Sequence, residues 1–196
     1  MNIADLLYAA YGNNIVIGRH IRRQLEHLRG MLPASFLGRH MDDLGCGDGR
    51  VTVLLEEIFQ PVKLRGCDIN PALVRMARTR GVDAEVLDLE RDVPGGELAI
   101  LWGVLYHLDD PHGCLRRVCD NYDLVCVREP LMGPSRICLE LGSPLAKDEL
   151  AALLSSSLPG ARIVGHRGCL FALLDQSEES PARLDGHPAH HEALAV

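Results

Sequence analysis

The chain has 196 residues, of which 47% are hydrophobic and 24% are charged, and its formal net charge is −7. These values are typical of one globular domain, and the negative charge gives no broad electrostatic reason to bind nucleic acid or an anionic membrane. No apolar run approaches the roughly 20 residues of a membrane-spanning helix, and the amino-terminal residues lack the basic start of a secretory signal. The seven cysteines form no CxxC pair. We therefore expect neither a zinc site nor a disulfide framework, and we expect a cytoplasmic protein with reduced thiols.

Residues 1–35 are predicted to form an amino-terminal helical cap. Residues 2–12 are expected to be a short apolar helix, and Asn14 is expected to be the N-cap of a second helix. In that second helix, which reaches Gly30, isoleucine and leucine recur at helical spacing while arginines occupy the other face. We interpret it as a surface helix that packs one apolar stripe onto a core.

The rest of the chain alternates between short strands and helices. Strands are predicted at 40–44, 62–67, 84–87, 98–102 and 122–127, and helices at 51–59, 71–80, 112–121 and 147–156. A terminal hairpin of strands follows at 162–166 and 169–174. Near-continuous apolar strands that alternate with helices predict an α/β fold with a doubly wound, mostly parallel sheet and helices on both faces.

The domain organisation follows from the same pattern. We expect a single domain over residues 1–175, and we expect the polar residues 176–196 to be a disordered tail. Residues 130–144, which are rich in proline and glycine, are expected to form a long loop over the sheet edge.

The loop after the first predicted strand carries glycine at three alternate positions, Gly45, Gly47 and Gly49. Glycine adopts positive φ readily and presents its backbone N–H without a Cβ atom in the way. At a strand end and ahead of a helix N-terminus, such a loop suits a partly anionic ligand that lies close to the main chain. For the loop taken alone, a tight turn without a ligand is the alternative.

Acidic residues follow the second and third predicted strands. Asp68 is placed where a carboxylate would accept hydrogen bonds from two ribose hydroxyls, and an ordinary loop acid is the alternative. Asp88 could accept a hydrogen bond from an adenine amino group or could cap a turn. Because ligands of such sheets lie beyond the carboxyl ends of the strands, we expect both acids, the glycine loop and residues 102–107 at one site.

These motifs resemble those of the class I S-adenosylmethionine-dependent methyltransferases over about residues 10–174. The nucleotide loop matches the family's acid-x-Gly-x-Gly-x-Gly pattern from Asp43 onward, and residues 66–70 are similar to the segment whose acid, here Asp68, holds the ribose. Asp88 and the residue after it resemble the pair beside the adenine, and residues 102–111 are similar to the segment after the fourth strand of many small-molecule members. The closing hairpin agrees with the antiparallel last strand of that family's seven-stranded sheet.

The resemblance implies S-adenosyl-L-methionine as the cofactor. The cofactor-binding residues that it implies are Asp43, Gly45, Cys46, Gly47, Gly49, Asp68, Ile69, Asp88, Leu89, Trp102 and Tyr11.

The resemblance also implies methyl transfer to oxygen or nitrogen of a small-molecule acceptor. A general base is needed only if the acceptor atom must lose a proton, and histidine titrates near neutral pH. His107 is therefore the candidate base, with simple packing in its loop as the alternative; Tyr106 and Glu129 are further candidates to face the substrate. Tyr8, Tyr11 and the loop 130–144 could form a lid that excludes water.

Other hypotheses stay open. A nicotinamide dehydrogenase would carry GxGxxG, but Arg50 stands at the sixth place of that pattern. The basic helix 19–29 keeps a tRNA or RNA methyltransferase in view, and a methyltransferase-fold protein that only binds a cofactor or a partner is a third alternative. Residues 102–103 and 128–129 lack the acids of the metal-dependent catechol type, so no metal is expected.

Overall fold

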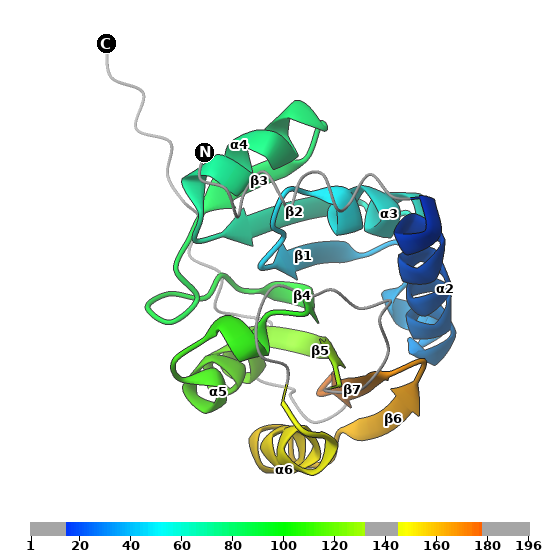
Figure 1. Ribbon diagram of the computed structural model, residues 1–196, viewed down its shortest axis with the longest axis vertical. Coiled ribbons are helices and arrows are strands. Elements are labelled where there is room, and N and C mark those ends of the chain that lie inside the picture. The colour runs from blue at the N-terminus through cyan, green and yellow to red at the C-terminus, as the bar shows by residue number, and fades with distance from the viewer. Residues whose placement is uncertain (1–14, 132–144, 178–196) are drawn as a thin grey trace.

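The computed structural model describes residues 15–131 and 145–177 (Figure 1). They form one seven-stranded sheet in the order β3-β2-β1-β4-β5-β7-β6. The strands are β1 (His40–Leu44), β2 (Lys63–Asp68), β3 (Asp83–Val86), β4 (Gly96–Trp102), β5 (Tyr122–Pro130), β6 (Arg162–His166) and β7 (Cys169–Asp175). β1 to β5 pair in parallel, and β7 runs antiparallel to both of its neighbours, β5 and β6. The predicted α/β fold and its antiparallel last strand are confirmed.

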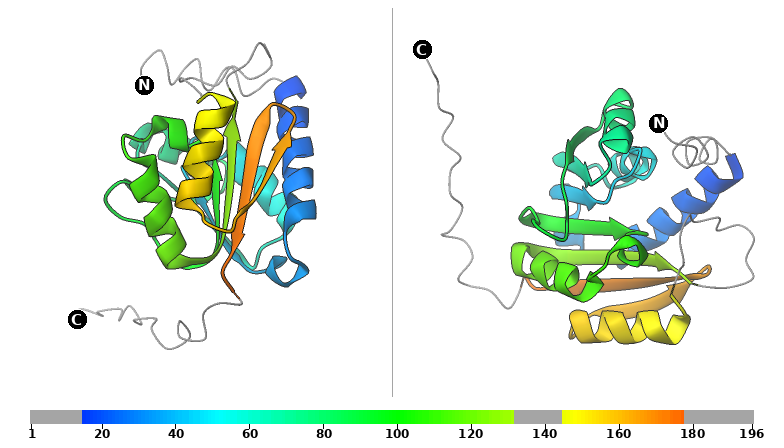
Figure 2. Two further views of the ribbon diagram at one scale, coloured as in Figure 1. Left: turned by 90° about the horizontal axis from the view of Figure 1, so that it is seen from below. Right: turned by 60° about the vertical axis from the view of Figure 1, so that its left-hand side comes forward.

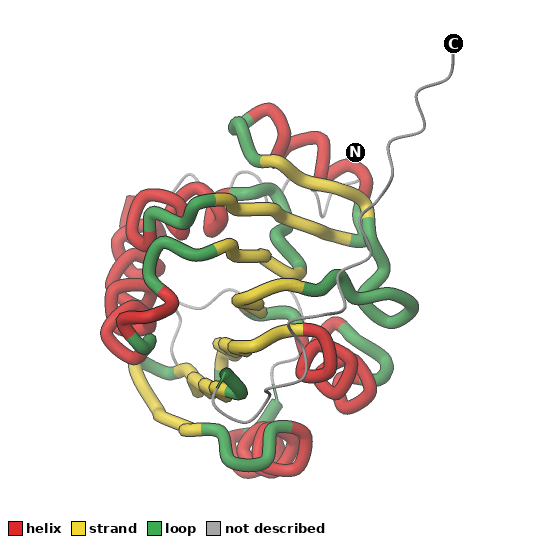
Figure 3. Tube along the Cα trace, turned by 180° about the vertical axis from the view of Figure 1, so that it is seen from behind, coloured by secondary structure: helices red, strands yellow, loops and turns green. Residues whose placement is uncertain are grey.

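Helices cover both faces of this sheet (Figures 2 and 3). They are α2 (Ile15–Met31), α3 (Arg50–Phe59), α4 (Pro71–Thr79), α5 (Pro111–Asn121) and α6 (Lys147–Ser157), with short 3-10 turns η1 (Ala34–Phe36) and η2 (Leu105–His107). In the left view of Figure 2, α5 and α6 lie on the opposite side of the sheet from α2. Among these described helices, none combines the length and apolarity that a membrane crossing requires.

α2 is amphipathic in the way its sequence predicts. Its apolar stripe places Leu25 and Leu28 in one core cluster with Leu55 of α3 and Ile100 of β4. On the polar face, Arg22 forms an exposed ion pair with Glu57 of α3, with 2.6 Å between nitrogen and oxygen. α2 therefore belongs to the helical layer on this face of the sheet. The predicted helix 2–12 and most of the polar tail lie outside the described residues.

The strand boundaries differ from the prediction at β5. The sequence indicated that this strand ends at residue 127 and that a loop begins at Pro130, whereas β5 continues through Pro130. The extra residues are held by antiparallel pairing, with Glu129 opposite Leu170 and Pro130 opposite Cys169. Proline marks a loop locally, but tertiary pairing with β7 keeps the chain extended there. Of the predicted loop, residues 132–144 lie outside the described part of the chain.

β2 and β3 alternate in polarity because α4 covers only one of their faces. Ala84 packs with Val74 and Ala77 of α4, whereas the connection from β3 to β4 contains no helix. On the uncovered side, Arg65 donates two hydrogen bonds to the buried Asp42 carboxylate, at 2.8 and 2.6 Å. Parallel pairing nevertheless brings the carboxyl ends of β1, β2, β4 and β5 to one edge, and the strand order reverses between β1 and β4. That edge is where such folds bind ligands.

Candidate cofactor and acceptor site

The glycine loop is closed tightly against its neighbours. Gly45, Gly47 and Gly49 all have positive φ, of 85°, 56° and 80°. The backbone N–H groups of Gly45 and Cys46 both donate to the Cys67 carbonyl of β2 at 2.8 Å. A Cβ atom on Gly45 would lie 2.5 Å from Val104 Cγ2. The loop therefore follows a path that only glycine permits at this position.

The Cys46 side chain packs beneath this loop, where its thiol donates a weak hydrogen bond to the Gly47 carbonyl at 3.7 Å. It is 6% exposed and belongs to the core cluster of Val74 and Ala77 on α4. Burial raises the pKa of its thiol, so the sulfur stays protonated at neutral pH. Contact of Cys46 with a cofactor stays a prediction.

Asp48, between two of the glycines, anchors the loop and was missed by the sequence analysis. Its side chain is buried and forms ion pairs with Arg50 at 2.7 Å and with Arg80 at 2.9 Å. Arg80 also donates from Nε to the Asp48 carbonyl at 2.9 Å, which ties the loop to the end of α4. The acid inside the glycine pattern was the available signal, but its second arginine partner, Arg80, is distant in sequence.

Asp68 connects the glycine loop to the end of β2. Oδ2 accepts a hydrogen bond from the Gly47 backbone N–H at 2.9 Å, and Oδ1 accepts one from the Asn70 N–H at 2.8 Å. Burial raises the pKa of the Asp68 carboxyl, and the two backbone hydrogen bonds and the charge of His107 oppose that rise. A carboxylate oxygen can accept more than one hydrogen bond, so each retains capacity for a hydroxyl of a bound ribose.

Asp43 is buried at the end of β1. Thr52 Oγ1 of α3 donates to Oδ2 at 2.6 Å, while Oδ1 has no hydrogen-bond partner within the described residues. Burial raises the pKa of the Asp43 carboxyl to about 7, the Thr52 hydrogen bond opposes the rise, and the charges of Asp68 and Asp42 add to it. A buried oxygen without a partner is rare in proteins, and it offers an acceptor to a ligand beside the loop.

The pKa of Asp43 makes stability depend on pH. Because Asp43 titrates near 3.8 when unfolded and near 7 when folded, the protonated form favours the folded state, and this contribution is lost as pH rises from about 4 to 7. We compare the free energy of unfolding of Asp43→Asn with that of wild type. We expect this difference to shift in favour of the variant by about 2–4 kcal/mol when the pH is raised from 5 to 8. Chemical denaturation at both pH values measures this, with Asp120→Asn on the surface of α5 as control. Equal gains in the two variants would contradict the assignment.

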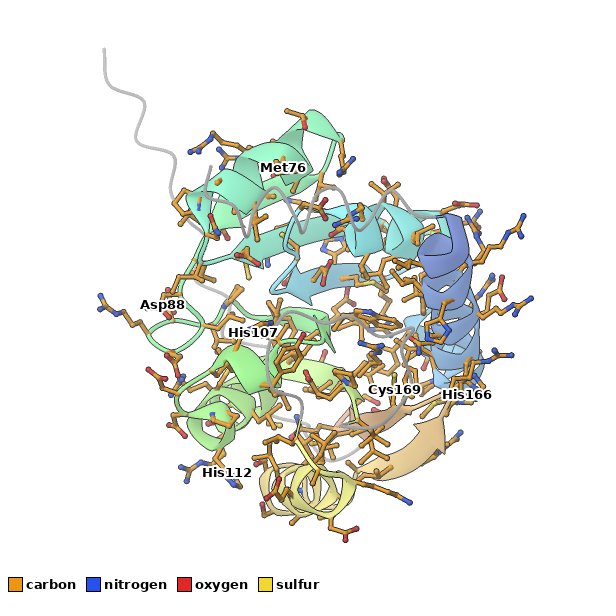
Figure 4. All side chains as sticks on the ribbon, viewed as in Figure 1. Met76, Asp88, His107, His112, His166 and Cys169 are labelled. Atoms are coloured by element: carbon orange, nitrogen blue, oxygen red, sulfur yellow. The ribbon has the colours of Figure 1, made fainter. Side chains whose placement is uncertain are left out.

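Asp88 caps the turn after β3. Asp88 lies in the β3–β4 loop (Figure 4). Its carboxylate accepts a hydrogen bond from the Glu90 N–H at 3.0 Å and forms an ion pair with Arg91 at 3.1 Å. The neighbouring Leu89 is buried in the core cluster under α5, whereas Ile69, after Asp68, is 63% exposed. Asp88 therefore caps a turn, which was the alternative to its contact with an adenine amino group. Contacts of these three residues with an adenine stay a prediction.

Trp102 ends β4 and is directed toward β5 and β7. Its ring lies edge-on to Phe171, with 6.1 Å between ring centroids, and the Arg128 guanidinium lies 5.1 Å from its ring centroid. We grouped Trp102 with the cofactor residues. These contacts place Trp102 beside the carboxyl end of β5 and the amino end of β7, and its contact with a cofactor stays a prediction.

His107 lies at the end of η2, near the middle of the strand edge in Figure 4. It is exposed, and its ring lies 4.1 Å from that of Tyr106, measured between centroids. Its charge acts on the Asp68 carboxyl, so it is in electrostatic range of the predicted ribose site. The structure thus brings the candidate base to the cofactor side of the strand edge.

Glu129 occupies a different position from the one we expected. It is 1% exposed, and its Oε1 accepts hydrogen bonds from the backbone N–H groups of Val104 at 2.7 Å and Leu105 at 2.9 Å. The carboxylate therefore lies beneath η2 and fixes the segment that carries Tyr106 and His107. Glu129 is a positioning residue in these contacts and does not face a substrate through Oε1.

The remaining predicted residues, Tyr8 and Tyr11, lie outside the described residues. Over residues 15–131 and 145–177, no group of three or more His, Cys, Asp or Glu side chains is arranged to hold a metal ion.

Comparison with known proteins agrees with this geometry. Residues 43–120 match the family described as Methyltransferase domain. The trans-aconitate 2-methyltransferase of Rhodococcus jostii (strain RHA1) is 37% identical over a 71-residue alignment, which covers 33% of this chain and 28% of that enzyme. The chain thus matches less than a third of the length of this relative.

Solved structures extend the similarity to the whole fold. A chain in the complex between the Haloferax volcanii Trm112 methyltransferase activator and a methyltransferase has a TM-score of 0.67 at 15% identity, over 90% of this chain and 98% of that one. The magnesium protoporphyrin IX methyltransferase of Synechocystis PCC 6803, solved with bound S-adenosylhomocysteine, has a TM-score of 0.59 at 14% identity, over 82% and 86% of the two chains. At these identities the likeness concerns the fold.

The described residues fit S-adenosylmethionine as a cofactor. The loop leaves no room for a Cβ at Gly45, Asp68 presents its carboxylate at the end of β2, and the buried Oδ1 of Asp43 has no partner in the described structure. Together with the strand order, these features are those of the class I methyltransferase fold, and residues 43–120 match the family described as Methyltransferase domain.

Proposed function

We propose that the protein transfers a methyl group from S-adenosylmethionine to oxygen or nitrogen of a small molecule. The main support is the glycine loop tied to Asp68 through the Gly47 N–H, because this arrangement joins the two parts of the nucleotide site. The relatives support a small acceptor, since trans-aconitate and magnesium protoporphyrin IX are the acceptors in their names. We also propose a cytoplasmic location, which the free thiols of all six described cysteines support.

The roles of the residues follow from their positions. When bound, S-adenosylmethionine supplies a methyl group already activated on a sulfonium, so the protein has mainly to position the acceptor. Such positioning can lower the activation barrier by up to about 7–11 kcal/mol. Asp68 would hold the ribose, and the loop N–H groups would lie against the cofactor. Glu129 keeps η2 in place from beneath, which sets the position of His107. His107 would take the proton of an acceptor hydroxyl or amine.

Calorimetric titration with S-adenosylmethionine and, separately, S-adenosylhomocysteine tests the cofactor site, and release of S-adenosylhomocysteine with candidate acceptors tests turnover. We expect His107→Ala to lower kcat about 100-fold or more on an acceptor that must lose a proton. Its affinity for S-adenosylhomocysteine should stay within about twofold of wild type, and the slope of kcat against pH below neutrality should flatten. His112→Ala, on the exposed start of α5, is the matched control.

Each outcome separates the hypotheses. A folded protein that binds neither compound would contradict the enzyme and favour an interaction scaffold. Binding of both without turnover on any small molecule, but with turnover on tRNA, would favour the RNA alternative. Normal turnover of His107→Ala on a proton-bearing acceptor would show that His107 is not the base.

A further inference from the structure

The glycine loop is flexible by composition, so contacts with other elements must hold it in one shape. Gly47 and Gly49 both have positive φ, and glycine has more backbone freedom than any other residue. A loop with alternate glycines therefore samples many conformations unless outside contacts restrict it. One such contact, from the Gly47 N–H to Asp68, ties the loop to β2. Asp48, between the two glycines, carries a second tie, to the end of α4.

This second tie comes from Arg80, the residue that follows α4. Its Nε donates to the Asp48 backbone carbonyl and its Nη2 donates to Asp48 Oδ2, both at 2.9 Å. One guanidinium thus holds the main chain and the side chain of the same loop residue, as the parallel donors of the arginine fork permit. The Asp48 side chain is 3% exposed and that of Arg80 is 32% exposed. Salt and water therefore screen this pair less than they screen a fully exposed one.

The turn that carries Arg80 is itself held against the loop. A Cβ atom on Gly49 would lie 2.9 Å from Cα and Cβ of Ala77 and 3.0 Å from Val82 Cγ2. The Ala77 carbonyl accepts hydrogen bonds from the N–H groups of Arg80 at 2.9 Å and Val82 at 3.2 Å. The end of α4 is therefore a fixed support from which the Arg80 guanidinium reaches the loop.

Removal of Arg80 would leave the Asp48 carboxylate with a cationic partner. Arg50 Nε also donates to Asp48 Oδ1 at 2.9 Å. This contact matters because a buried carboxylate that loses its last cation destabilises a protein strongly. Arg50 begins α3, the helix into which the loop runs, so its pairing with Asp48 does not tie the loop to a distant part of the chain. Arg80 can therefore be replaced with the carboxylate still paired.

We propose that Arg80 is a positioning residue for the cofactor, because it acts through Asp48 to keep the glycine loop in its binding conformation. This inference rests on the proposed methyltransferase function and adds a residue outside the motifs of the sequence. Without this tie, the loop occupies its binding conformation for a smaller fraction of the time, and the apparent affinity falls by that fraction. Once the cofactor is bound the loop is ordered again, so the KM for S-adenosylmethionine changes more than kcat.

Calorimetric titration with S-adenosylhomocysteine tests the proposal. We expect Arg80→Met to weaken binding about tenfold. Arg80→Lys restores a cation beside the carboxylate but not the fork, and should bring the affinity back to within about threefold of wild type. Arg78→Met is the matched control, since Arg78 Nε donates to the Ala84 carbonyl of β3 at 2.7 Å. This control loses an arginine–carbonyl hydrogen bond from the same end of α4 without releasing the loop, so its affinity should equal that of wild type.

Amide hydrogen exchange gives a second readout, which a general loss of stability would not produce. In the absence of ligand, residues 45–50 of Arg80→Met should exchange about tenfold faster than those of wild type. Exchange in β4 and β5 should match that of Arg78→Met. Saturation with S-adenosylhomocysteine should remove the difference in the loop, because the bound cofactor holds the loop in its place.

The results distinguish this proposal from the proposed function. If wild type does not bind S-adenosylhomocysteine, the methyltransferase function fails and this proposal fails with it. If wild type binds but Arg80→Met has the same affinity, or Arg78→Met weakens binding equally, only the positioning role is overturned. Thermal melting verifies the fold of each variant. If Arg80→Met is unfolded, Arg80→Gln takes its place, and wild-type affinity in that variant overturns the role.

Discussion

Gly45→Ala is expected to lower the free energy of unfolding by about 2–5 kcal/mol, because backbone strain and overpacking add together. The same substitution is expected to abolish measurable binding of S-adenosylhomocysteine. Gly45 has φ of 85°, and a Cβ there would lie 2.5 Å from Val104 Cγ2. Val104 cannot move aside cheaply, because its backbone N–H is held by Glu129 at 2.7 Å. The loop would have to shift, and its N–H groups would shift with it. Chemical denaturation and calorimetric titration measure the two effects.

Gly160→Ala is the matched control for this substitution. Gly160 has the same φ of +85°, but a Cβ there would meet nothing within 4 Å. It should therefore show the backbone strain alone, about 1–2 kcal/mol, with cofactor affinity unchanged. If Gly45→Ala equals this control in both stability and affinity, the close contact with Val104 has no part in shaping the site.

Asp68→Ala is expected to weaken S-adenosylhomocysteine binding by about 100-fold or more, because a charge-assisted hydrogen bond contributes about 1.5–3 kcal/mol and the variant would lose the two proposed bonds to the ribose. The Gly47 and Asn70 N–H groups also lose their acceptor, so the loop loses its tie to β2. Asp68→Asn keeps one acceptor oxygen and should weaken binding less, by about tenfold. Titration calorimetry of the folded variants measures both values.

Asp83→Ala, an exposed acid at the start of β3, is the control for charge alone. It removes the same charge from the opposite end of the neighbouring strand and should leave affinity unchanged. Wild-type affinity in a folded Asp68→Ala protein would mean that the cofactor does not lie across the ends of β1 and β2.

The order and type of the elements could be predicted because their signals are local. Strand β4 is almost wholly apolar, and α2 carries an apolar stripe at helical spacing. Asn70 before Pro71 predicted a helix start, and the Asn70 side chain does accept a hydrogen bond from the Ala72 N–H at 2.9 Å. The glycine pattern predicted the loop because positive φ is a property of single residues, and the position of Asp68 after β2 predicted its nearness to that loop.

The tertiary structure alone decided which side chains meet. Whether Glu129 faces outward or lies beneath η2 depends on the register of β5 against β4, and a slip of one residue would turn it to the other face. The pairing of Asp48 with Arg80 and the stacking of Arg128 on Trp102 join residues that are distant in sequence. Local patterns therefore determined the fold class and the cofactor loop, whereas the acceptor side arose from packing between strands and helices that no single stretch of sequence encodes.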